Sequence, residues 1–314
     1  MIKKECFTAE WIEQVSSELH YNDKNLIEKV IRALSLLEML VKAGCPLVFK
    51  GGTALMLILG KSAHRLSIDI DLICPPGTNI EDYLKSFADF GFINLELVER
   101  KQRDDADIPK SHSKFFYQIA YRNDTDAQSY ILLDVLYEDI HYFRTQQIAI
   151  NCPFIRLEGK PLMVTVPSAE DILGDKLTAF APNTTGIPYY RNGRSCSMEI
   201  AKQLYDVGRL FENVSDLQIT KEAFRKIAVV ELSYRSFGTD IGQVFNDIRQ
   251  TALCISTRGK AGEGDFDLIQ DGIIRVKSFM YKQRYLIDHA IIDAARAAYL
   301  ATLIEKGINE IESY

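Results

Sequence analysis

The sequence predicts an α+β protein in two domains, a strand-containing one over residues 1–166 and a helical one over residues 167–314. The chain has 314 residues, which exceeds the usual size of a single domain. Short apolar segments bounded by glycine or proline occur in its first half and have the lengths of strands. In its second half the apolar residues recur mainly at helical spacing, which favours a helical bundle.

Composition and charge limit the function classes. Hydrophobic residues make up 47% of the chain and charged residues 25%, values typical of a folded globular protein. The formal net charge of −6 argues against sequence-independent coating of nucleic acid, which needs a basic surface, but it permits a local basic groove. Residues 1–7 lack the apolar core of a signal peptide, and no apolar run approaches the roughly 20 residues that span a bilayer. We therefore expect a cytoplasmic protein.

The cysteines do not form a metal-binding or disulfide pattern. No C-x-x-C pair is present, and no histidine stands at zinc-finger spacing from a cysteine. We expect reduced thiols, most of them buried, at Cys6, Cys45, Cys74, Cys152, Cys196 and Cys254.

Residues 8–44 are predicted to form two helices. Apolar residues over 25–42 recur at helical spacing on a broad face, and Gly44 and Pro46 then end the helix. The second helix is expected to pack on a sheet.

Residues 46–59 are predicted to form a short buried strand, a turn at Gly51-Gly52 and a helix. Glycine permits positive φ and lets backbone N–H groups approach a ligand. Thr53 is expected to cap a helix over residues 54–59, whose free N–H groups and dipole favour an anion. A glycine turn without a ligand is the alternative.

The tripeptide Gly60-Lys61-Ser62 has the form of the end of a P-loop. The glycine that a P-loop requires five positions earlier is Leu55, and the tripeptide follows a helix instead of opening one. A Walker-type NTPase is therefore excluded.

Residues 66–74 alternate between apolar and polar side chains, which predicts a strand. Side chains two residues apart lie about 6.6 Å apart on one face, so Asp69 and Asp71 should point together. Paired carboxylates of this kind can hold one or two Mg²⁺ ions for phosphoryl chemistry. Solvent-facing acids on an edge strand are the alternative.

A third acid, Asp134, lies in the middle of the apolar segment 129–137. A lone buried carboxylate is costly, so we expect it to have a cation or a partner. Ligation of the same metal as Asp69 and Asp71 would supply one. A structural salt bridge to a buried arginine is the alternative.

The order of these features resembles the nucleotidyltransferase fold of the DNA polymerase β superfamily. Within it, Phe49-Lys50-Gly51-Gly52-Thr53-Ala54-Leu55 and Arg65-Leu66-Ser67-Ile68-Asp69-Ile70-Asp71-Leu72 look like the F-K-G-G-T-x-L and R-h-S-x-D-h-D-h motifs of the AbiEii/AbiGii toxin family. This family belongs to type IV toxin–antitoxin systems and is linked to abortive infection. The resemblance implies a nucleotidyltransferase-fold mixed β-sheet with flanking helices, followed by a C-terminal helical bundle.

Two downstream segments extend the resemblance to about residue 211. Residues 169–179 are similar to the family helix that carries a lysine, here Lys176, and residues 202–207 are similar to its R/K-D-h-Y-D-h motif, which ends near Asp206. Two differences concern the substrate side: Gln203 stands where the family usually has Asp, and the loop over residues 182–195 is longer and richer in glycine and proline. Beyond residue 211, helices are expected at about 220–235, 239–257, 265–281 and 285–306.

The resemblance and the chemistry of the residues together assign the site. The expected catalytic residues are Asp69, Asp71, Asp134, Lys176 and Asp206, of which Asp69, Asp71 and Asp134 would hold Mg²⁺. The expected binding residues for the phosphates of an NTP are Lys50, Gly51, Gly52, Thr53, Arg65, Ser67 and Lys176. The helical domain would contribute Lys176 and Asp206 to a cleft.

Plainer interpretations of the charged residues stay open at this point. Lys50, Arg65 or Lys176 could be solvated cations. Asp206 lies four residues after Lys202 and three before Arg209, so a helical ion-pair cluster would also explain it.

The sequence and the resemblance predict an enzyme that moves a nucleoside monophosphate from an NTP to an acceptor. The resemblance implies a toxin role, an antitoxin protein encoded nearby, and RNA as an acceptor, with the tRNA 3′ end as one candidate. Acceptor-binding residues are expected at Arg191, Arg194 and Lys202, because guanidinium and aromatic groups suit phosphates and unpaired bases. The alternatives are transfer of AMP or UMP to a protein hydroxyl and a non-catalytic nucleotide-binding module.

Overall fold

The computed structural model describes residues 1–98, 110–122, 127–234 and 240–311, and the chain divides into two compact units. The sheet unit comprises Met1–Ile140, Thr145–Pro167 and Phe279–Gln283. The helical unit comprises His141–Arg144, Ser168–Ser278 and Arg284–Tyr314. A single division after residue 166 would place His141–Arg144 in the sheet unit and Phe279–Gln283 in the helical unit. In the structure each of these short segments belongs to the other unit.

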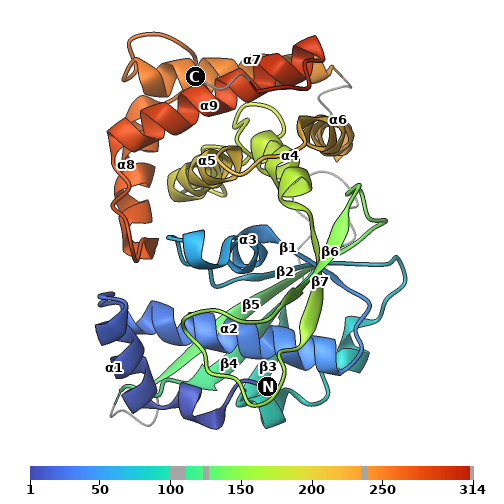
Figure 1. Ribbon diagram of the computed structural model, residues 1–314, viewed down its shortest axis with the longest axis vertical. Helices are drawn as coiled ribbons and strands as arrows, with labels where there is room; N and C mark the ends of the chain where they lie inside the picture. Colours follow the sequence, from blue (N-terminus) through green and yellow to red (C-terminus); the bar gives the residue numbers. More distant parts are fainter. Residues whose placement is uncertain (99–109, 123–126, 235–239, 312–314) are drawn as a thin grey trace. The chain divides into compact units, whose positions relative to one another are not determined.

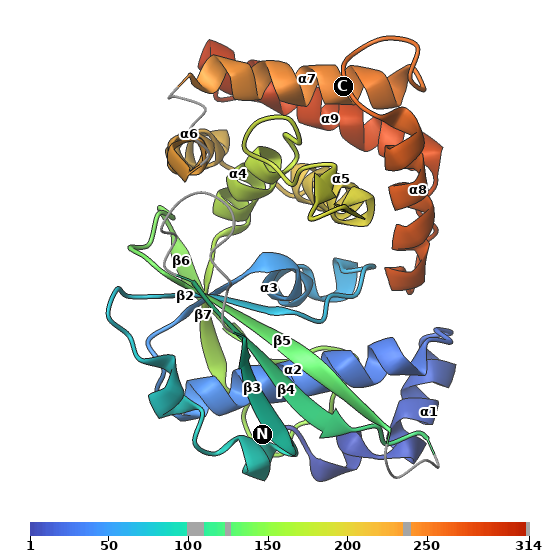
Figure 2. The same ribbon diagram turned by 180° about the vertical axis from the view of Figure 1, so that it is seen from behind.

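The sheet unit is built on a mixed sheet of five strands in the order β1, β2, β5, β4, β3 (Figures 1 and 2). β1 (Val48–Lys50) is antiparallel to β2 (Ile70–Cys74), which is parallel to β5 (Gln128–Tyr137). β4 (Lys110–Gln118) is antiparallel to both β5 and β3 (Asn94–Val98). The predicted fold class, a mixed sheet with flanking helices and helices following it, is confirmed.

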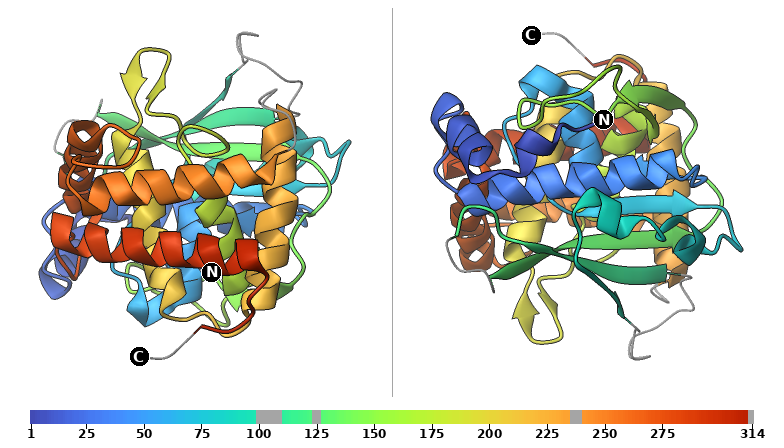
Figure 3. Two further views of the ribbon diagram at one scale, coloured as in Figure 1. Left: turned by 90° about the horizontal axis from the view of Figure 1, so that it is seen from above. Right: turned by 90° about the horizontal axis from the view of Figure 1, so that it is seen from below.

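The two helices predicted over residues 8–44 are both present. α1 (Ala9–Glu18) is capped by the Thr8 hydroxyl, and α2 (Lys24–Lys42) by the Asp23 carboxylate. α2 crosses one face of the sheet, as the view from below shows (Figure 3). Its apolar residues belong to the same buried core as those of β2 and β5, so the helix covers the apolar face of the sheet.

The remaining elements of the sheet unit are short. α3 (Gly51–Leu59) follows β1 directly, and β6 (Thr145–Ala149) pairs with β7 (Met163–Pro167) in a separate two-stranded ribbon. Short 3₁₀ segments occur at Lys4–Phe7, Gly60–Ser62, Ile80–Tyr83 and Phe87–Phe90.

A segment from far along the chain completes the sheet unit. The Leu66 amide donates to the Phe279 carbonyl at 2.8 Å, and the Tyr281 amide donates to the His64 carbonyl at 3.0 Å. The Tyr281 ring packs edge-on against Phe154. The helix expected at 265–281 is therefore too long, because its last residues serve as a pairing segment that holds residues 64–66 in place.

The helical unit contains six α-helices and one small β-hairpin among its described residues. In Figures 1 and 3, α7 and α9 run side by side. The helices are α4 (Ala169–Ala179), α5 (Ser197–Phe211), α6 (Leu217–Tyr234), α7 (Ile241–Ser256), α8 (Phe266–Val276) and α9 (Ile287–Lys306). Positions 235 and 239, where two predicted helices were expected to end and begin, lie outside the described residues. None of the described helices has the length and apolar character needed to cross a membrane.

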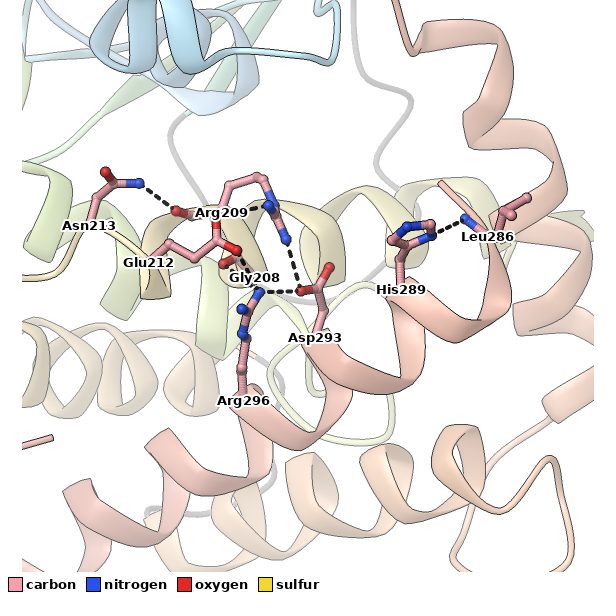
Figure 4. Close-up of polar contacts among 8 residues, drawn as sticks. All are labelled: Gly208, Arg209, Glu212, Asn213, Leu286, His289, Asp293 and Arg296. Atoms are coloured by element: carbon pink, nitrogen blue, oxygen red, sulfur yellow. Dashed lines mark hydrogen bonds and ion pairs between the residues drawn. The ribbon is translucent and has the colours of Figure 1, made fainter. Parts of the chain in front are cut away.

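A buried carboxylate joins α5 to α9 (Figure 4). Asp293 accepts hydrogen bonds from Arg209 Nη2 at 3.3 Å and from Arg296 Nη1 at 3.0 Å. A Cβ at Gly208 would lie 2.0 Å from Asp293 Oδ1, so the two helices approach this closely only because residue 208 is glycine. Burial raises the pKa of Asp293, and the two arginines oppose that rise.

Candidate active site

Four polar residues lie in register across four neighbouring strands of the sheet. Lys50 on β1 is paired with Asp71 on β2, Asp71 with Asp134 on β5, and Asp134 with His112 on β4. Because residues directly opposite in neighbouring strands share a face of the sheet, all four side chains belong to one face. We call Lys50, Asp71, Asp134 and His112 the polar row.

The opposite face is apolar. Phe49 is paired with Leu72, and Leu72 with Val135, and all three side chains are buried. This alternation follows from the period of two in a strand, which sends each apolar residue to the core and its neighbour to the other side. The core thereby fixes which face carries the polar row.

Asp69 lies just before β2, because the strand begins at Ile70 and not at the predicted residue 66. Its carbonyl accepts a hydrogen bond from the Thr53 hydroxyl at 2.7 Å. Thr53 is fully buried, so its hydroxyl ties α3 to the chain at Asp69. The side chains of Asp69 and Asp71 are both partly exposed.

The predicted start of α3 is wrong. The helix begins at Gly51, with Lys50 in the N-cap position, so Thr53 is the third residue of the helix and not its cap. The amides of Gly51, Gly52 and Thr53 therefore belong to the first turn, where helix geometry provides no backbone acceptor for them. This places the anion-favouring end of the helix directly after β1.

The two glycines bring the start of α3 against the predicted site residues. A Cβ at Gly51 would lie 2.0 Å from Asp71 Oδ2, and Gly51 has a φ of +81°. A Cβ at Gly52 would lie 2.7 Å from Ser67 Oγ and 3.0 Å from Arg65 Nη2. The helix N-terminus, one acid, one hydroxyl and one guanidinium are thus gathered in one place.

Arg65 is not the solvated surface cation that the sequence left open. Its side chain is buried, and Nη1 donates to the Leu66 carbonyl at 3.0 Å. An isolated bridge pairs Arg65 with Met280. The returning segment Phe279–Gln283 therefore helps to hold Arg65 beside α3.

We expect Gly51→Ala to lower nucleotide transfer by at least about a hundredfold, because a displacement of about 1 Å in a catalytic group can have an effect of this size. The new methyl group overlaps Asp71, while the positive φ alone costs about 1–2 kcal/mol. Gly77→Ala is the matched control, since Gly77 has a φ of +83° and no atom within 4 Å of an added Cβ. Thermal melts and transfer rates of the two variants measure the difference. Equal losses in both would contradict a role for the close approach to Asp71.

Asp134 has a partner that the sequence analysis missed. His112 Nδ1 is hydrogen-bonded to Asp134 Oδ1. The Asp134 side chain is 39% exposed and that of His112 23% exposed, so the expected burial of Asp134 is wrong, whereas the expectation of a partner is confirmed. The expected alternative, an ion pair with a buried arginine, is also not what the structure shows.

We expect His112→Ala to reduce transfer by about ten- to a hundredfold, the usual effect of removing a group that orients a site carboxylate. His112→Asn should retain more activity, because its amide nitrogen can occupy the position of Nδ1. Lys114→Ala is a control on the same strand, where Lys114 pairs with Glu96 at 3.3 Å. Initial rates at saturating NTP compare the three variants, and equal rates for the Ala and Asn variants would remove the orienting role.

Oxygen ligands are available at the site, but they do not form a closed metal cage. Within the described parts of the chain, no three His, Cys, Asp or Glu side chains are grouped so that they could hold one metal ion. Mg²⁺ is usually bound by one or two carboxylates together with substrate phosphates and water, and seldom by an all-protein cage. Asp69 and Asp71 fit that pattern, and ligation by Asp134 stays a prediction.

The helical unit holds a second group of predicted site residues. Lys176 Nζ on α4 lies 3.0 Å from Asp206 Oδ2 on α5 and donates to Gln203 Oε1 at 2.9 Å. The side chains of Lys176 and Asp206 are only 10% and 2% exposed. Lys176 is therefore not a solvated helical lysine, and Asp206 has Lys176 on the neighbouring helix as a partner.

The predicted acceptor-binding residues also lie in the helical unit. Lys202 is on α5, and Arg191 and Arg194 are on the small hairpin formed by β8 (Tyr190–Arg191) and β9 (Arg194–Ser195). The six cysteines are free, and four of them are buried.

A mixed sheet that sets carboxylates beside the glycine-opened start of a helix is the arrangement of a nucleotide-transferring enzyme. A family model described as "Nucleotidyl transferase AbiEii toxin, Type IV TA system" matches residues 34–286. The chain belongs to this AbiEii family, and it is a nucleotidyltransferase of the type IV toxin class.

Several solved structures are similar to the chain, including JHP933 and MenT4. JHP933 from Helicobacter pylori is 17% identical, with a TM-score of 0.46, over 90% of this chain and 94% of that one. MenT4, the nucleotidyltransferase toxin Rv2826c from Mycobacterium tuberculosis H37Rv, is 14% identical, with a TM-score of 0.49, over 94% of this chain and 89% of that one. No curated protein sequence matches the chain.

Proposed function

We propose that the protein is a Mg²⁺-dependent toxin that transfers a nucleoside monophosphate from an NTP to RNA, with the tRNA 3′ end as one candidate acceptor. An antitoxin protein encoded nearby would neutralise it. The observation that supports this most directly is the meeting of Asp71 with the glycine-opened start of α3, since it sets a carboxylate beside an anion-binding helix terminus. The AbiEii membership supports the toxin role.

The sheet unit would bind the triphosphate. The amides of Gly51 and Gly52 point to phosphate oxygens in this proposal, and the guanidinium of Arg65 and the ammonium of Lys50 balance their charge. Ser67 and Thr53 were predicted as further phosphate ligands. Ser67 lies beside Gly52 and suits that role, whereas the Thr53 hydroxyl is engaged by the Asp69 carbonyl.

The carboxylates would serve the reacting atoms. Asp69 and Asp71, with Asp134 as the predicted third ligand, would hold Mg²⁺, which when bound supplies positive charge to the phosphate oxygens. The acceptor hydroxyl oxygen bonds to the α-phosphorus, the bond from the α-phosphorus to the bridging oxygen breaks, and pyrophosphate leaves. Asp134, oriented by His112, is placed in this proposal to accept the hydroxyl proton.

Lys176 and Asp206 are proposed to act on the NTP from the helical unit. Lys176 would bind the incoming phosphates, and Asp206 and Gln203 would hold its ammonium group in position. The contribution of both residues to a shared cleft remains a prediction of the sequence and the family resemblance.

The test is transfer from each of four labelled NTPs to bulk RNA and, separately, to lysate protein, with Asp71→Ala as the inactive reference. We expect labelled RNA in the wild-type reaction and no labelled RNA in the Asp71→Ala reaction. If protein is labelled and RNA is not, the acceptor is a protein hydroxyl and not RNA. If neither is labelled, and Mg²⁺ with NTP leaves the melting temperature unchanged, the chain acts as something other than a transferase.

A further inference from the structure

The hairpin of β8 and β9 is a small, defined element of the helical unit. Its two central residues, Asn192 and Gly193, have φ values of +52° and +74°. Positive φ at both central residues is the type I′ turn, whose twist matches that of the flanking strands. The hairpin is therefore a formed structure and not a loose polar loop.

Two arginines face each other across this hairpin. Arg191 and Arg194 are register partners, and both are exposed. Like charges directly opposite in a strand pair are destabilising. In the portion of the chain that the structure describes, neither guanidinium takes part in an ion pair or a hydrogen bond, so the molecule keeps an uncompensated positive pair at this point. An anionic ligand would compensate it.

Hydrogen bonds hold the start of the loop and the base of the hairpin. The Asp247 carboxylate accepts hydrogen bonds from the Asn183 amide at 2.9 Å and from the Thr184 hydroxyl at 2.8 Å. The Cys196 amide donates to the Tyr189 carbonyl at 2.9 Å, closing the hairpin at its base. Asp247 itself is buried on α7, so these hydrogen bonds anchor the start of the loop to the helical unit. A backbone that is already ordered adds little to the entropic cost of binding, so the main ordering cost is that of the two arginine side chains.

The two faces of the hairpin differ. Successive side chains of a strand point to opposite faces, so Arg191 and Arg194 share one face and Tyr190 lies on the other. Tyr190 is 57% exposed, the largest exposed fraction among the exposed large hydrophobic side chains of the described residues. A charged face and an exposed ring within a few residues match the phosphate and base components of a single-stranded nucleic acid.

We propose that this hairpin grips the phosphodiester backbone of the RNA acceptor through Arg191 and Arg194. The inference rests on the proposed transfer to RNA and adds the element that holds the acceptor. The overall charge of −6 supports a local grip of this kind, because the rest of the surface gives a polyanion little attraction.

The experiment measures binding of a labelled single-stranded RNA over a series of salt concentrations, without NTP. Each phosphate of a single strand that the protein neutralises adds about 0.7 to the slope of log affinity against log salt, so Arg191→Ala with Arg194→Ala should lower the slope by about 1.4. Tyr190→Ala, on the other face, should leave the slope unchanged. A double variant of two exposed lysines of the helical unit, Lys260→Ala with Lys306→Ala, removes the same charge and should change neither slope nor affinity.

The outcomes separate this inference from the proposed function. An unchanged slope in the arginine variant, with RNA still labelled by the wild type, would overturn the grip and leave RNA transfer standing. If the lysine variant lowers the slope by the same amount, the effect comes from the overall charge of the protein. That result would also overturn the proposed role of Arg191 and Arg194. If the wild type neither binds nor labels RNA, both proposals fail. The NTP-dependent shift in melting temperature should be the same in all variants, which confirms that they are folded.

Discussion

Asp71→Asn is expected to reduce nucleotide transfer by about a thousandfold or more. The substitution keeps the size of the side chain that lies against Gly51 but removes the negative charge that would hold Mg²⁺. Metal stabilisation of phosphate charge contributes several kcal/mol, and each 1.36 kcal/mol is a factor of about ten in rate. Incorporation of label from NTP into the acceptor measures the effect.

Asp89→Asn is the matched control for this prediction. Asp89 is an exposed acid of the same unit, in a 3₁₀ segment outside the polar row. Its neutralisation should leave both transfer and the Mg²⁺-dependent thermal shift unchanged, whereas Asp71→Asn should abolish both. A rate above a tenth of the wild-type value in Asp71→Asn would remove Asp71 from the chemistry, since neutralising a metal ligand should have a far larger effect.

The parts of the site that could be predicted from sequence are those formed by neighbouring residues. Gly51, Gly52, Asp69 and Asp71 lie within one short stretch, and the alternation of apolar residues around Asp71 determines the face of the sheet on which it lies. Even there the details escaped prediction. Glycine is a poor helix former, so the sequence predicts that α3 starts after Thr53 instead of at Gly51.

His112 was missed because its role depends on strand register. It precedes Asp134 by more than twenty residues, and a shift of one residue between β4 and β5 would place Ser111 or Ser113 opposite the acid instead. An isolated histidine in a sequence carries no such information. One signal in the sequence is the alternation of the basic residues His112 and Lys114 with Ser113 and Phe115, which are buried in the structure. It indicates a strand with His112 on its polar face.

The burial of Asp134 was misjudged for a different reason. Leu132 and Leu136 share its face and are only partly buried, whereas Leu133 and Val135 are buried on the other. A strand with apolar residues on both faces has the pattern of a fully buried strand even when one face is partly open. The composition of the segment therefore could not show that Asp134 is accessible to a ligand.

Contacts between distant segments were beyond the sequence. Residues 279–283 have the apolar spacing of a helix end, but they pair with residues 61–66 and hold Arg65 beside α3. The Asn-Gly dipeptide of the β8–β9 hairpin is, by contrast, a readable signal, because this pair is strongly preferred in two-residue hairpin turns.

Gln203 shows how a departure from the family pattern is accommodated. Its amide oxygen accepts a hydrogen bond from Lys176 Nζ, as a carboxylate in that position could, but it adds no second negative charge. The single positive charge of Lys176 is then balanced by the single negative charge of Asp206. If Lys176 binds phosphate, its ammonium group attracts an anion more strongly beside one carboxylate and one amide than it would beside two carboxylates.

Lys176→Met is expected to lower stability by about 3 kcal/mol and to abolish measurable transfer. The substitution removes a buried cation from beside Asp206, whose side chain is only 2% exposed, and breaking a buried ion pair from one side is strongly destabilising. The double variant Lys176→Met with Asp206→Leu should recover most of the stability, because an apolar pair of similar volume can replace a buried ion pair. Thermal melts measure the first quantity, and transfer rates at a temperature where every variant is folded measure the second.

The double variant decides what Lys176 does. If the pair only joins α4 to α5, restoring stability should restore transfer as well; if Lys176 binds phosphate, the double variant should be stable and inactive. Arg209→Met provides the control for a buried pair of the same unit, since Arg209 contacts Asp293, which is also buried and keeps Arg296 as a second partner (Figure 4). That variant should be destabilised but active. A stable, active double variant would show that Lys176 and Asp206 have a structural role only, with the chemistry carried out by residues of the sheet unit.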